Sequence, residues 1–547
     1  IGKLSFNDHR GLQVQNLTSN FTYTKKNILL ENLDLTTPES LMKGKVELKY
    51  VREDFSDFNN KVVFDVQLDK AQIASNDLNY FYNEFGKNNL FKIDTHLVGT
   101  LNNFTTYNLK LTDSKNSEIL GTVNFKNLFN KKESFYIKGK FSKIASSYDN
   151  LTYILPNILG KNIPTALSKL GNFTIIGNTE LTDTYINSDV YITSLLGNVK
   201  SNLSIQDLKN IDNATYQGNV ILENFDLGKL INQEDIGSVT LNFDIDGQGF
   251  NQKYLDTQIK GTIDSFNFNN YNYHNIIVDG NLKMPYFKGY FNSNDTNLKM
   301  DFDGLVDLSS KVKNYNFKAN IDYADLFALH FSKIDSISIF KGDIAFSAKG
   351  NTLNDLDGTL NIHNVSYQND INYYFFEDFQ LNSSFDEQRI RTITVNSPDI
   401  ISGKVVGKYK IEEVKKIIEN AVGSLYANYT PNKLQKGQFL DFNFTIYNKI
   451  VEIFVPEVSI SENTKIKGKI NADLGKFEFD FTSPSVVAYE NYFNNIKVDI
   501  DNKNPLYNTY VEMDSIRTKN YKISDFNLIN LTMNDTLFVR SEFKGGQ

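Results

Sequence analysis

The stretch that decides the fold runs from Val239 to Gly280 and reads VTLNFDIDGQGFNQKYLDTQIKGTIDSFNFNNYNYHNIIVDG. In its first part, apolar residues at 239, 241, 243 and 245 alternate with polar residues at 240, 242, 244 and 246. After a short hydrophilic break the same alternation returns at 259, 261 and 263. Because side chains alternate between the two faces of a strand, this period of two predicts strands with one apolar face and one face in water.

The same alternation recurs along nearly the whole chain, for example at 62–68 and 317–321 and almost without interruption from 440 to 500. Closed barrels and sandwiches end after about 100 to 250 residues and then need a linker. No linker is visible, and the 547 residues include only nine prolines. We therefore predict an all-β fold: a long, curled, open β-sheet, or β-taco, with an apolar interior and a few short helices.

The predicted sheet has about 30 to 35 strands, which at about 4.8 Å each gives a groove on the order of 150 Å long. Residues 1–547 are expected to form one continuous elongated β-groove segment of a larger chain, since both ends of the sequence look cut. Helical insertions are predicted near 151–170, 323–331 and 411–422. The last is the clearest, because apolar residues at 411, 414, 417, 418, 421 and 422 share one helical face. The triplet Val451, Ile453 and Val455 is predicted to be a strand.

A degenerate repeat, apolar-x-[Asn/Asp]-apolar-x-apolar, runs through these strands. Its copies lie at 30–35, 222–227, 273–278, 376–381, 493–498 and 523–528. The polar residue that interrupts the alternation is what a strand–bulge–strand junction needs. A second echo pairs TTPESLMKGKVELKY (36–50) with NSPDIISGKVVGKY (396–409).

Composition excludes several classes of protein. The net charge of −8, with Lys and Arg thinly spread, argues against nucleic acid as a partner. The absence of cysteine excludes disulfide scaffolds and thiolate metal sites. No apolar run of about 18 residues occurs, so no helical bilayer span is expected within this sequence.

Catalytic and metal-binding patterns are weak. The five histidines are scattered, and Asp244-x-Asp246-Gly247 and Asp301-x-Asp303-Gly304 lack the further carboxylates of a calcium loop. We therefore expect no enzyme, no catalytic residue, no bound metal and no cofactor.

An apolar groove of this kind must meet something other than water, and acyl chains fit. The residues predicted to line a lipid-binding groove are Val239, Leu241, Phe243, Ile245, Ile259, Ile263, Met300, Phe302, Ile344, Phe346, Phe442, Phe444, Ile453, Phe477, Phe479 and Phe481.

Three segments carry a family resemblance: GTIDSFNFNNYNYHNIIVDG (261–280), DGTLNIHNVSYQN (357–369) and SPDIISGKVVGKYKIEEV (397–414). Together with the strand rhythm they resemble the TamB proteins of the AsmA-like superfamily, in their Bacteroidota form. The resemblance covers essentially the whole chain through loose motifs, none of which is diagnostic alone.

The resemblance implies a β-taco groove in the periplasm, running from an inner-membrane helix to an outer-membrane Omp85-type barrel of the TamA kind. It implies phospholipids as cargo and a role in outer-membrane biogenesis and protein assembly. This segment would be the middle of the bridge, without the N-terminal inner-membrane anchor or the C-terminal domain.

Two other functions remain open on the sequence. A surface adhesin or structural protein of β-sandwich repeats would have modules near 100 residues, Pro-marked linkers and a self-filled core. An outer-membrane barrel would have strands of about ten residues with aromatic girdles; the predicted helices and the acidic turns argue against it.

Overall fold

A computed structural model describes residues 1–81, 85–127, 133–154, 156, 165–210, 212–250, 253–283, 285–333, 335–425, 429–533 and 536–545. Its fold is an open, 33-stranded antiparallel β-sheet with a few short helices. The predicted fold class is confirmed, and the number of strands falls within the expected range.

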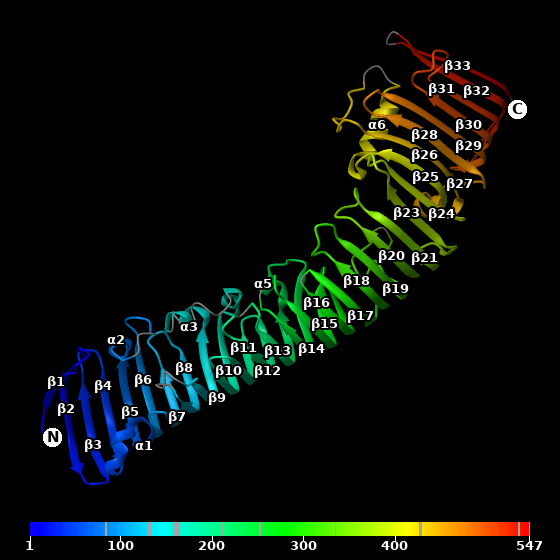
Figure 1. The fold of residues 1–547 in the computed structure, drawn as a ribbon. Coiled ribbons are helices and arrows are strands. Elements are labelled where there is room, and N and C mark those ends of the chain that lie inside the picture. The colour runs from blue at the N-terminus through cyan, green and yellow to red at the C-terminus, as the bar shows by residue number, and fades with distance from the viewer. Residues whose placement is uncertain are drawn as a thin grey trace. The chain divides into compact units, whose positions relative to one another are not determined.

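The chain divides into two compact units, Ile1–Met284 and Pro285–Gln547. Within each unit the strands lie side by side in chain order (Figure 1). That one groove continues through both units stays a prediction.

Every strand of the first unit pairs with the next along the chain. These strands are β1 (Leu4–Asn7), β2 (Gln13–Tyr23), β3 (Asn27–Thr36), β4 (Leu41–Lys49), β5 (Val63–Ala74), β6 (Leu90–Thr100), β7 (Asn103–Thr112), β8 (Glu118–Lys126), β9 (Tyr136–Ser147), β10 (Asn172–Thr182), β11 (Tyr185–Ser194), β12 (Gly197–Gln206), β13 (Thr215–Asp226), β14 (Ile236–Gln248), β15 (Asp256–Phe268) and β16 (Tyr271–Lys283).

The second unit follows the same rule, except that β22 and β23 both pair with β21, β26 pairs with β28, and β27 pairs with β29. Its strands are β17 (Tyr286–Asn294), β18 (Leu298–Asp307), β19 (Asn314–Asp325), β20 (Ile339–Lys349), β21 (Asp357–Gln368), β22 (Tyr373–Phe376), β23 (Phe379–Phe385), β24 (Arg391–Ser397), β25 (Ile401–Lys408), β26 (Phe439–Ile446), β27 (Val458–Ile460), β28 (Thr464–Asn471), β29 (Lys476–Ala488), β30 (Asn491–Asp501), β31 (Thr509–Arg517), β32 (Lys522–Met533) and β33 (Thr536–Gly545).

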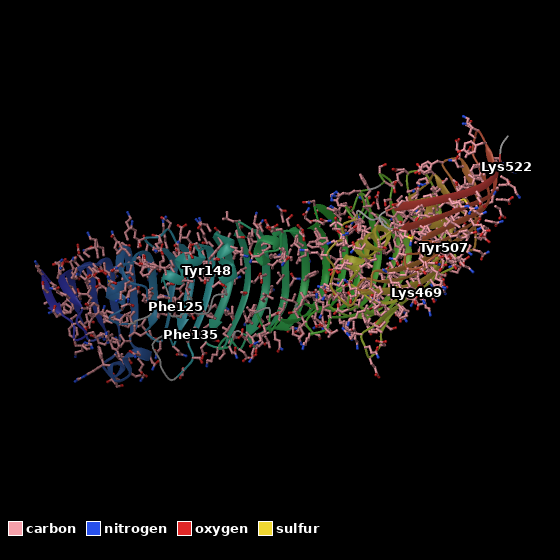
Figure 2. The ribbon with its side chains drawn as sticks, turned by 90° about the horizontal axis from the view of Figure 1, so that it is seen from above. Phe125, Phe135, Tyr148, Lys469, Tyr507 and Lys522 are labelled. Carbon is pink, nitrogen blue, oxygen red and sulfur yellow. The ribbon has the colours of Figure 1, made fainter. Side chains whose placement is uncertain are left out.

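Side chains project from both faces of these strands (Figure 2). In β14, Val239 and Leu241 are buried, whereas Asn242 and Asp244 on the other face are exposed. The alternation in the sequence therefore does separate an apolar face of the strand from a solvent-exposed face.

Three residues of the short repeat lie at bulges. Asn32, Asn224 and Asp525 have φ of 50°, 47° and 49°, and each lies where the strand register shifts. The predicted junction is confirmed for these three copies. Asn275 and Asn495 share the left-handed conformation, but the register of β15 with β16, and of β30 with its two neighbours, does not shift there. Asp378 lies between β22 and β23.

The similar segments 36–50 and 396–409 also share a structural feature. Gly44 and Gly403 occupy equivalent places in β4 and β25, with φ of 150° and 148°. A β-carbon at Gly403 would collide with the carbonyl oxygen of Asn443 on the neighbouring strand, so only glycine fits there.

The described helices are short. They are η1 (Arg52–Asp57), α1 (Phe58–Lys61), α2 (Ser75–Leu78), α3 (Tyr148–Ile154), η2 (Thr165–Leu170), α5 (Leu227–Ile231), η3 (Ile411–Glu413), α6 (Val414–Gly423) and α7 (Asn448–Phe454). The helix predicted near 411–422 is confirmed as η3 and α6. Within the prediction for 151–170, α3 and η2 are helical, and residues 155 and 157–164 lie outside the described part of the chain.

The helix predicted over 323–331 is wrong. Residues up to Asp325 belong to β19, since Ala324 pairs with both Leu298 and Phe340. The Asp325 Oδ1 then accepts hydrogen bonds from the backbone N–H groups of Phe327 (3.1 Å) and Ala328 (3.0 Å), which closes a turn. The spacing looked helical because this turn buries Leu329.

The strand predicted at Val451, Ile453 and Val455 is also wrong, because Asn448–Phe454 form α7. The Asn448 side chain donates to Glu452 one helical turn later (2.8 Å) and accepts from the N–H of Ile460 (2.7 Å). Strand β26 pairs directly with β28, so the sheet has no vacant position for this segment.

The accessible surface of the chain is 31,462 Å², where a compact protein of 62.5 kDa would expose on the order of 20,000 Å². Many apolar side chains are therefore only half-buried. None of the helices in the described part of the chain combines the length and the apolar character that a bilayer span requires.

Candidate functional site

An apolar cavity of about 510 Å³ lies between α6 and the apolar face of the second unit's sheet. The helix packs on β28 and β29. The cavity walls are Val405, Tyr409, Val414, Ile418, Val422, Leu440, Phe442, Phe444, Ile466, Ile470, Phe477, Phe479 and Ile500.

Strand register explains why these side chains meet. Phe442 pairs with Val405 on one side and Gly468 on the other, and Gly468 pairs with Phe479. Directly paired residues share a face of the sheet. A β-carbon at Gly468 would lie 2.5 Å from the Phe442 ring, so the ring rests on the glycine backbone and the wall stays open.

The helix presents two different apolar rows. Ile417 and Ala421 are buried, at 1% and 6% exposed, and belong to a core cluster with Leu440, Ile470 and Phe477. Ile418 and Val422 line the cavity yet remain 46% and 43% exposed. The cavity therefore opens to the surface along this second row.

Side-chain hydrogen bonds, three of them to glutamate carboxylates, hold the start of η3 and α6. The Asn354 Oδ1 accepts from the N–H of Ile411 (2.8 Å), and its Nδ2 donates to Glu412 (2.8 Å). The Glu413 carboxylate accepts from the N–H of Gln435 (3.1 Å) and from the Gln438 side chain, which lowers the pKa of Glu413.

The far end of α6 is held in the same way. Asn420 donates to the carbonyl of Asn432 (2.9 Å) and accepts from the Asn432 N–H (2.7 Å) and the Tyr429 hydroxyl (2.9 Å). These contacts and the buried Ile417 and Ala421 fix α6 over the sheet.

One end of the cavity has a polar edge. Tyr409 is half-buried, and burial raises the pKa of its phenol, an effect that the positive charge of Arg391 opposes. Arg391 is 5% exposed, and desolvation lowers the pKa of its guanidinium.

The predicted groove residues in the first unit fall into two groups. Val239 and Leu241 are buried in a core with Leu196 and Phe225, against which Phe243 and Ile263 pack. Ile245 and Ile259 pair with each other farther along β14 and β15 and are half-buried.

Four predicted residues of the second unit lie on neighbouring strands. Phe302 and Phe346 flank Phe317, with ring centroids 5.1 and 5.4 Å apart, and Met300 and Ile344 pair with Ile321 and Ala319. The three phenylalanines form an aromatic ladder across β18, β19 and β20.

The structure brings Phe442, Phe444, Phe477 and Phe479 together at the α6 cavity, and Phe481 lies beside them through its pairing with Ile466. Ile453 lies on α7 and is not among the residues that line this cavity. Three residues of α6 also line the cavity and are absent from the predicted groove residues: Val414, Ile418 and Val422. Their spacing, four residues apart, is the sequence signal of a second apolar row on the helix.

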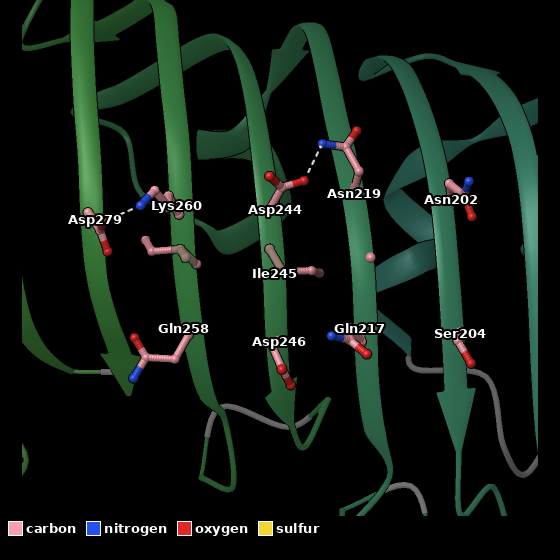
Figure 3. A pocket seen from close by; sticks show the side chains of 12 residues that line it. Asn202, Ser204, Gln217, Asn219, Asp244, Ile245, Asp246, Gln258, Lys260 and Asp279 are labelled. Atoms are coloured by element: carbon pink, nitrogen blue, oxygen red, sulfur yellow. Dashed lines mark hydrogen bonds and ion pairs between the residues drawn. The ribbon is translucent and has the colours of Figure 1, made fainter.

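A larger hollow, about 710 Å³, lies over β12 to β16 of the first unit (Figure 3). Its charged and amide groups already pair across strands: Lys260 with Asp279 at 3.0 Å and Asn219 with Asp244 at 3.0 Å. Ile245 and Ile259 also contribute to its wall. This arrangement is what a solvated polar face provides.

Within the described ranges, no group of three or more His, Asp or Glu side chains could hold a metal ion. His96 and His363 instead contact single carboxylates, Asp65 and Asp378, each at 2.8 Å.

Comparison of the chain with protein-family models, with curated proteins and with solved structures gave no match.

Proposed function

We propose that this protein binds phospholipid acyl chains on the apolar face of its sheet and carries them along it. The observation that supports this most is the α6 cavity, whose walls are almost entirely aliphatic and aromatic and whose mouth exposes Ile418 and Val422. Its volume of about 510 Å³ lies in the range of about 300 to 1,000 Å³ typical of small-ligand sites.

The driving force is the hydrophobic effect. Each methylene that leaves water for an apolar wall contributes about 0.8 kcal/mol, and a half-buried apolar face offers that gain along many strands. A binding site that is open on one side suits lipid transfer, because the acyl chain of the lipid can leave it without unfolding of the sheet.

The proposed cellular role rests on the resemblance to TamB proteins. In this role the protein is a periplasmic segment of a bridge between the two membranes, anchored in the inner membrane through a part outside this sequence. It passes phospholipids toward the outer membrane, with an Omp85-type barrel as partner, and supports outer-membrane biogenesis. The open sheet does not favour the alternative, an adhesin of sandwich repeats, since such modules close their cores within each repeat.

Site-specific photocrosslinking tests the proposal. A photoreactive residue at Phe442 faces the cavity, whereas Asn443 is exposed on the opposite face and is the matched control. We expect phospholipid adducts at 442 and none at 443 after expression in bacteria. Phe243 and Asn242 form the equivalent pair in the first unit. Absence of adducts at both apolar positions would refute lipid carriage.

A further inference from the structure

The strongest unexplained feature of the second unit is a buried cation on its apolar face. Arg391 pairs with Gly407, Gly407 with Leu440, and Leu440 with Ile470, so the four residues form one row across β24 to β28. Because directly paired residues share a face, the guanidinium begins on the same face as the cavity wall.

The charge of Arg391 has no carboxylate partner among the described residues. Its Nε donates to the Ser383 hydroxyl (2.9 Å), its Nη1 to the carbonyl of Leu353 (2.8 Å) and its Nη2 to the carbonyl of Leu356 (3.2 Å). All three acceptors are neutral, and a guanidinium has five N–H donors. The guanidinium also lies over the Phe385 ring, and the Asp355 and Asp357 carboxylates act on its charge from beyond ion-pair distance. A buried charge without a direct ion pair is costly, so an anion within hydrogen-bonding distance would be favoured.

Gly407 lies between Arg391 and Leu440 in this row. A β-carbon there would lie 2.2 Å from the carbonyl oxygen of Phe439 and 3.1 Å from Cδ1 of Tyr409, so the glycine lets the Tyr409 ring lie close to the backbone beside Arg391. Tyr409 also lines the cavity, and its hydroxyl has no hydrogen-bond partner within the described part of the chain. A phenol at the edge of an apolar wall can donate to a ligand oxygen.

We propose that the α6 cavity is a seat for one acyl chain of a phospholipid, and that Tyr409 and Arg391 form the subsite that receives its phosphate. The inference rests on the proposed function and adds to it a head-group preference at one place. The cavity supplies an apolar slot, and the arginine supplies the only buried positive charge on the row beside it that the structure describes.

The test uses the whole chain and two probes with the same alkyl chain, dodecyl phosphate and dodecanol, titrated below micelle formation. We expect dodecyl phosphate to bind about tenfold tighter or more, because a charge-assisted hydrogen bond to a buried group contributes about 1.5 to 3 kcal/mol. Inorganic phosphate alone should not bind, since the acyl slot supplies most of the affinity.

In Arg391→Gln, the preference for dodecyl phosphate should disappear while dodecanol affinity stays the same. Lys408→Gln is the matched control, because it removes one positive charge from the exposed face of β25. It should keep the preference. Tyr409→Phe should weaken dodecyl phosphate by a few-fold and leave dodecanol unchanged, and it tests the subsite should Arg391→Gln fail to fold.

The other outcomes separate the two proposals. Equal binding of both probes to the unmodified protein would overturn the phosphate subsite and leave acyl binding intact. Equal losses for both probes in Arg391→Gln would show that the arginine only pins residues 353–356. Loss of the preference in Lys408→Gln would attribute it to general surface charge. Failure of both probes to bind would overturn the proposed function at this cavity as well.

Discussion

Single asparagines shape the strands of this protein more than any other polar residue does. Asn224 has a φ of 47° at the bulge between β13 and β14, and its side chain is exposed. Left-handed φ costs an L-residue roughly 1 to 2 kcal/mol unless it is glycine, asparagine or aspartate. The repeated Asn or Asp is therefore a backbone requirement and not a binding motif.

Asn224→Val should lower the free energy of unfolding by about 1 to 2 kcal/mol, because a β-branched side chain tolerates this conformation poorly. Asn224→Gly should cost far less. Chemical denaturation measures both. Gln217→Val, at an exposed extended position of the same strand, is the control and should change stability by no more than about 0.5 kcal/mol. Equal effects at 217 and 224 would contradict the role of the bulge.

A pH-dependent contribution is expected at Asp65. The Lys49 ammonium at 2.7 Å, and then His96 at 2.8 Å, lower the pKa of the Asp65 carboxyl. A carboxyl with a lowered pKa stabilises the fold above its unfolded pKa, near 3.9, and loses that contribution as the pH falls through its folded pKa. Because the pair is partly solvated, the effect at neutral pH is about 1 kcal/mol or less.

Asp65→Asn should therefore be less stable than the unmodified protein at pH 7, and the difference should disappear as the pH falls through the lowered folded pKa of Asp65. Urea denaturation across this range measures the difference. A difference that persists at low pH would mean that the asparagine disturbs packing rather than charge.

At the scale of elements, α6 places a residue that stabilises the fold next to a residue that faces the proposed lipid site. Ile417 is 1% exposed in the core, and Ile418 is 46% exposed at the cavity mouth. Ile417→Ala should cost about 2 to 4 kcal/mol of stability. Ile418→Ala should cost less than about 1 kcal/mol, yet weaken dodecanol binding several-fold. Thermal unfolding and titration of the two variants give both quantities. The reverse order of stability effects would contradict the assigned orientation of α6.

The elements also show where sequence patterns succeed. Period two over many residues identified the strands, because one face of each truly meets water. The pattern failed where only three residues alternate, at 451–455, and where a turn buries one residue, Leu329, so that apolar spacing imitates a helix. Side-chain hydrogen bonding by Asp325 and Asn448 stabilises the observed turn and helix in those segments. The sequence does not show whether such hydrogen bonds or the burial of the apolar residues contributes more to the local structure.

At the scale of the whole molecule, strands pair almost only with their neighbours in the chain, which is why the open sheet was predictable from alternation alone. The site was predictable in part. Phe442, Phe444, Phe477 and Phe479 follow from the strand pattern, and the helix beside them follows from its own period. That α6 covers these four residues, and that Arg391 lies in the adjacent row, depends on register and on loop contacts such as those of Asn354.

Pairing between chain neighbours also predicts how the molecule unfolds. In arrays of this kind, stability is approximately a sum of local contributions and nearest-neighbour interfaces. Ile417→Ala should therefore speed amide hydrogen exchange in β25, β26, β28 and β29 and leave β13 to β15 unchanged. Val239→Ala, at a residue 2% exposed in the other core, is the mirror variant and should act on β13 to β15 alone. Exchange measured strand by strand by mass spectrometry decides the matter. Faster exchange in both regions from either variant would show that the sheet unfolds as a single cooperative unit, which would contradict stability built from neighbouring strands.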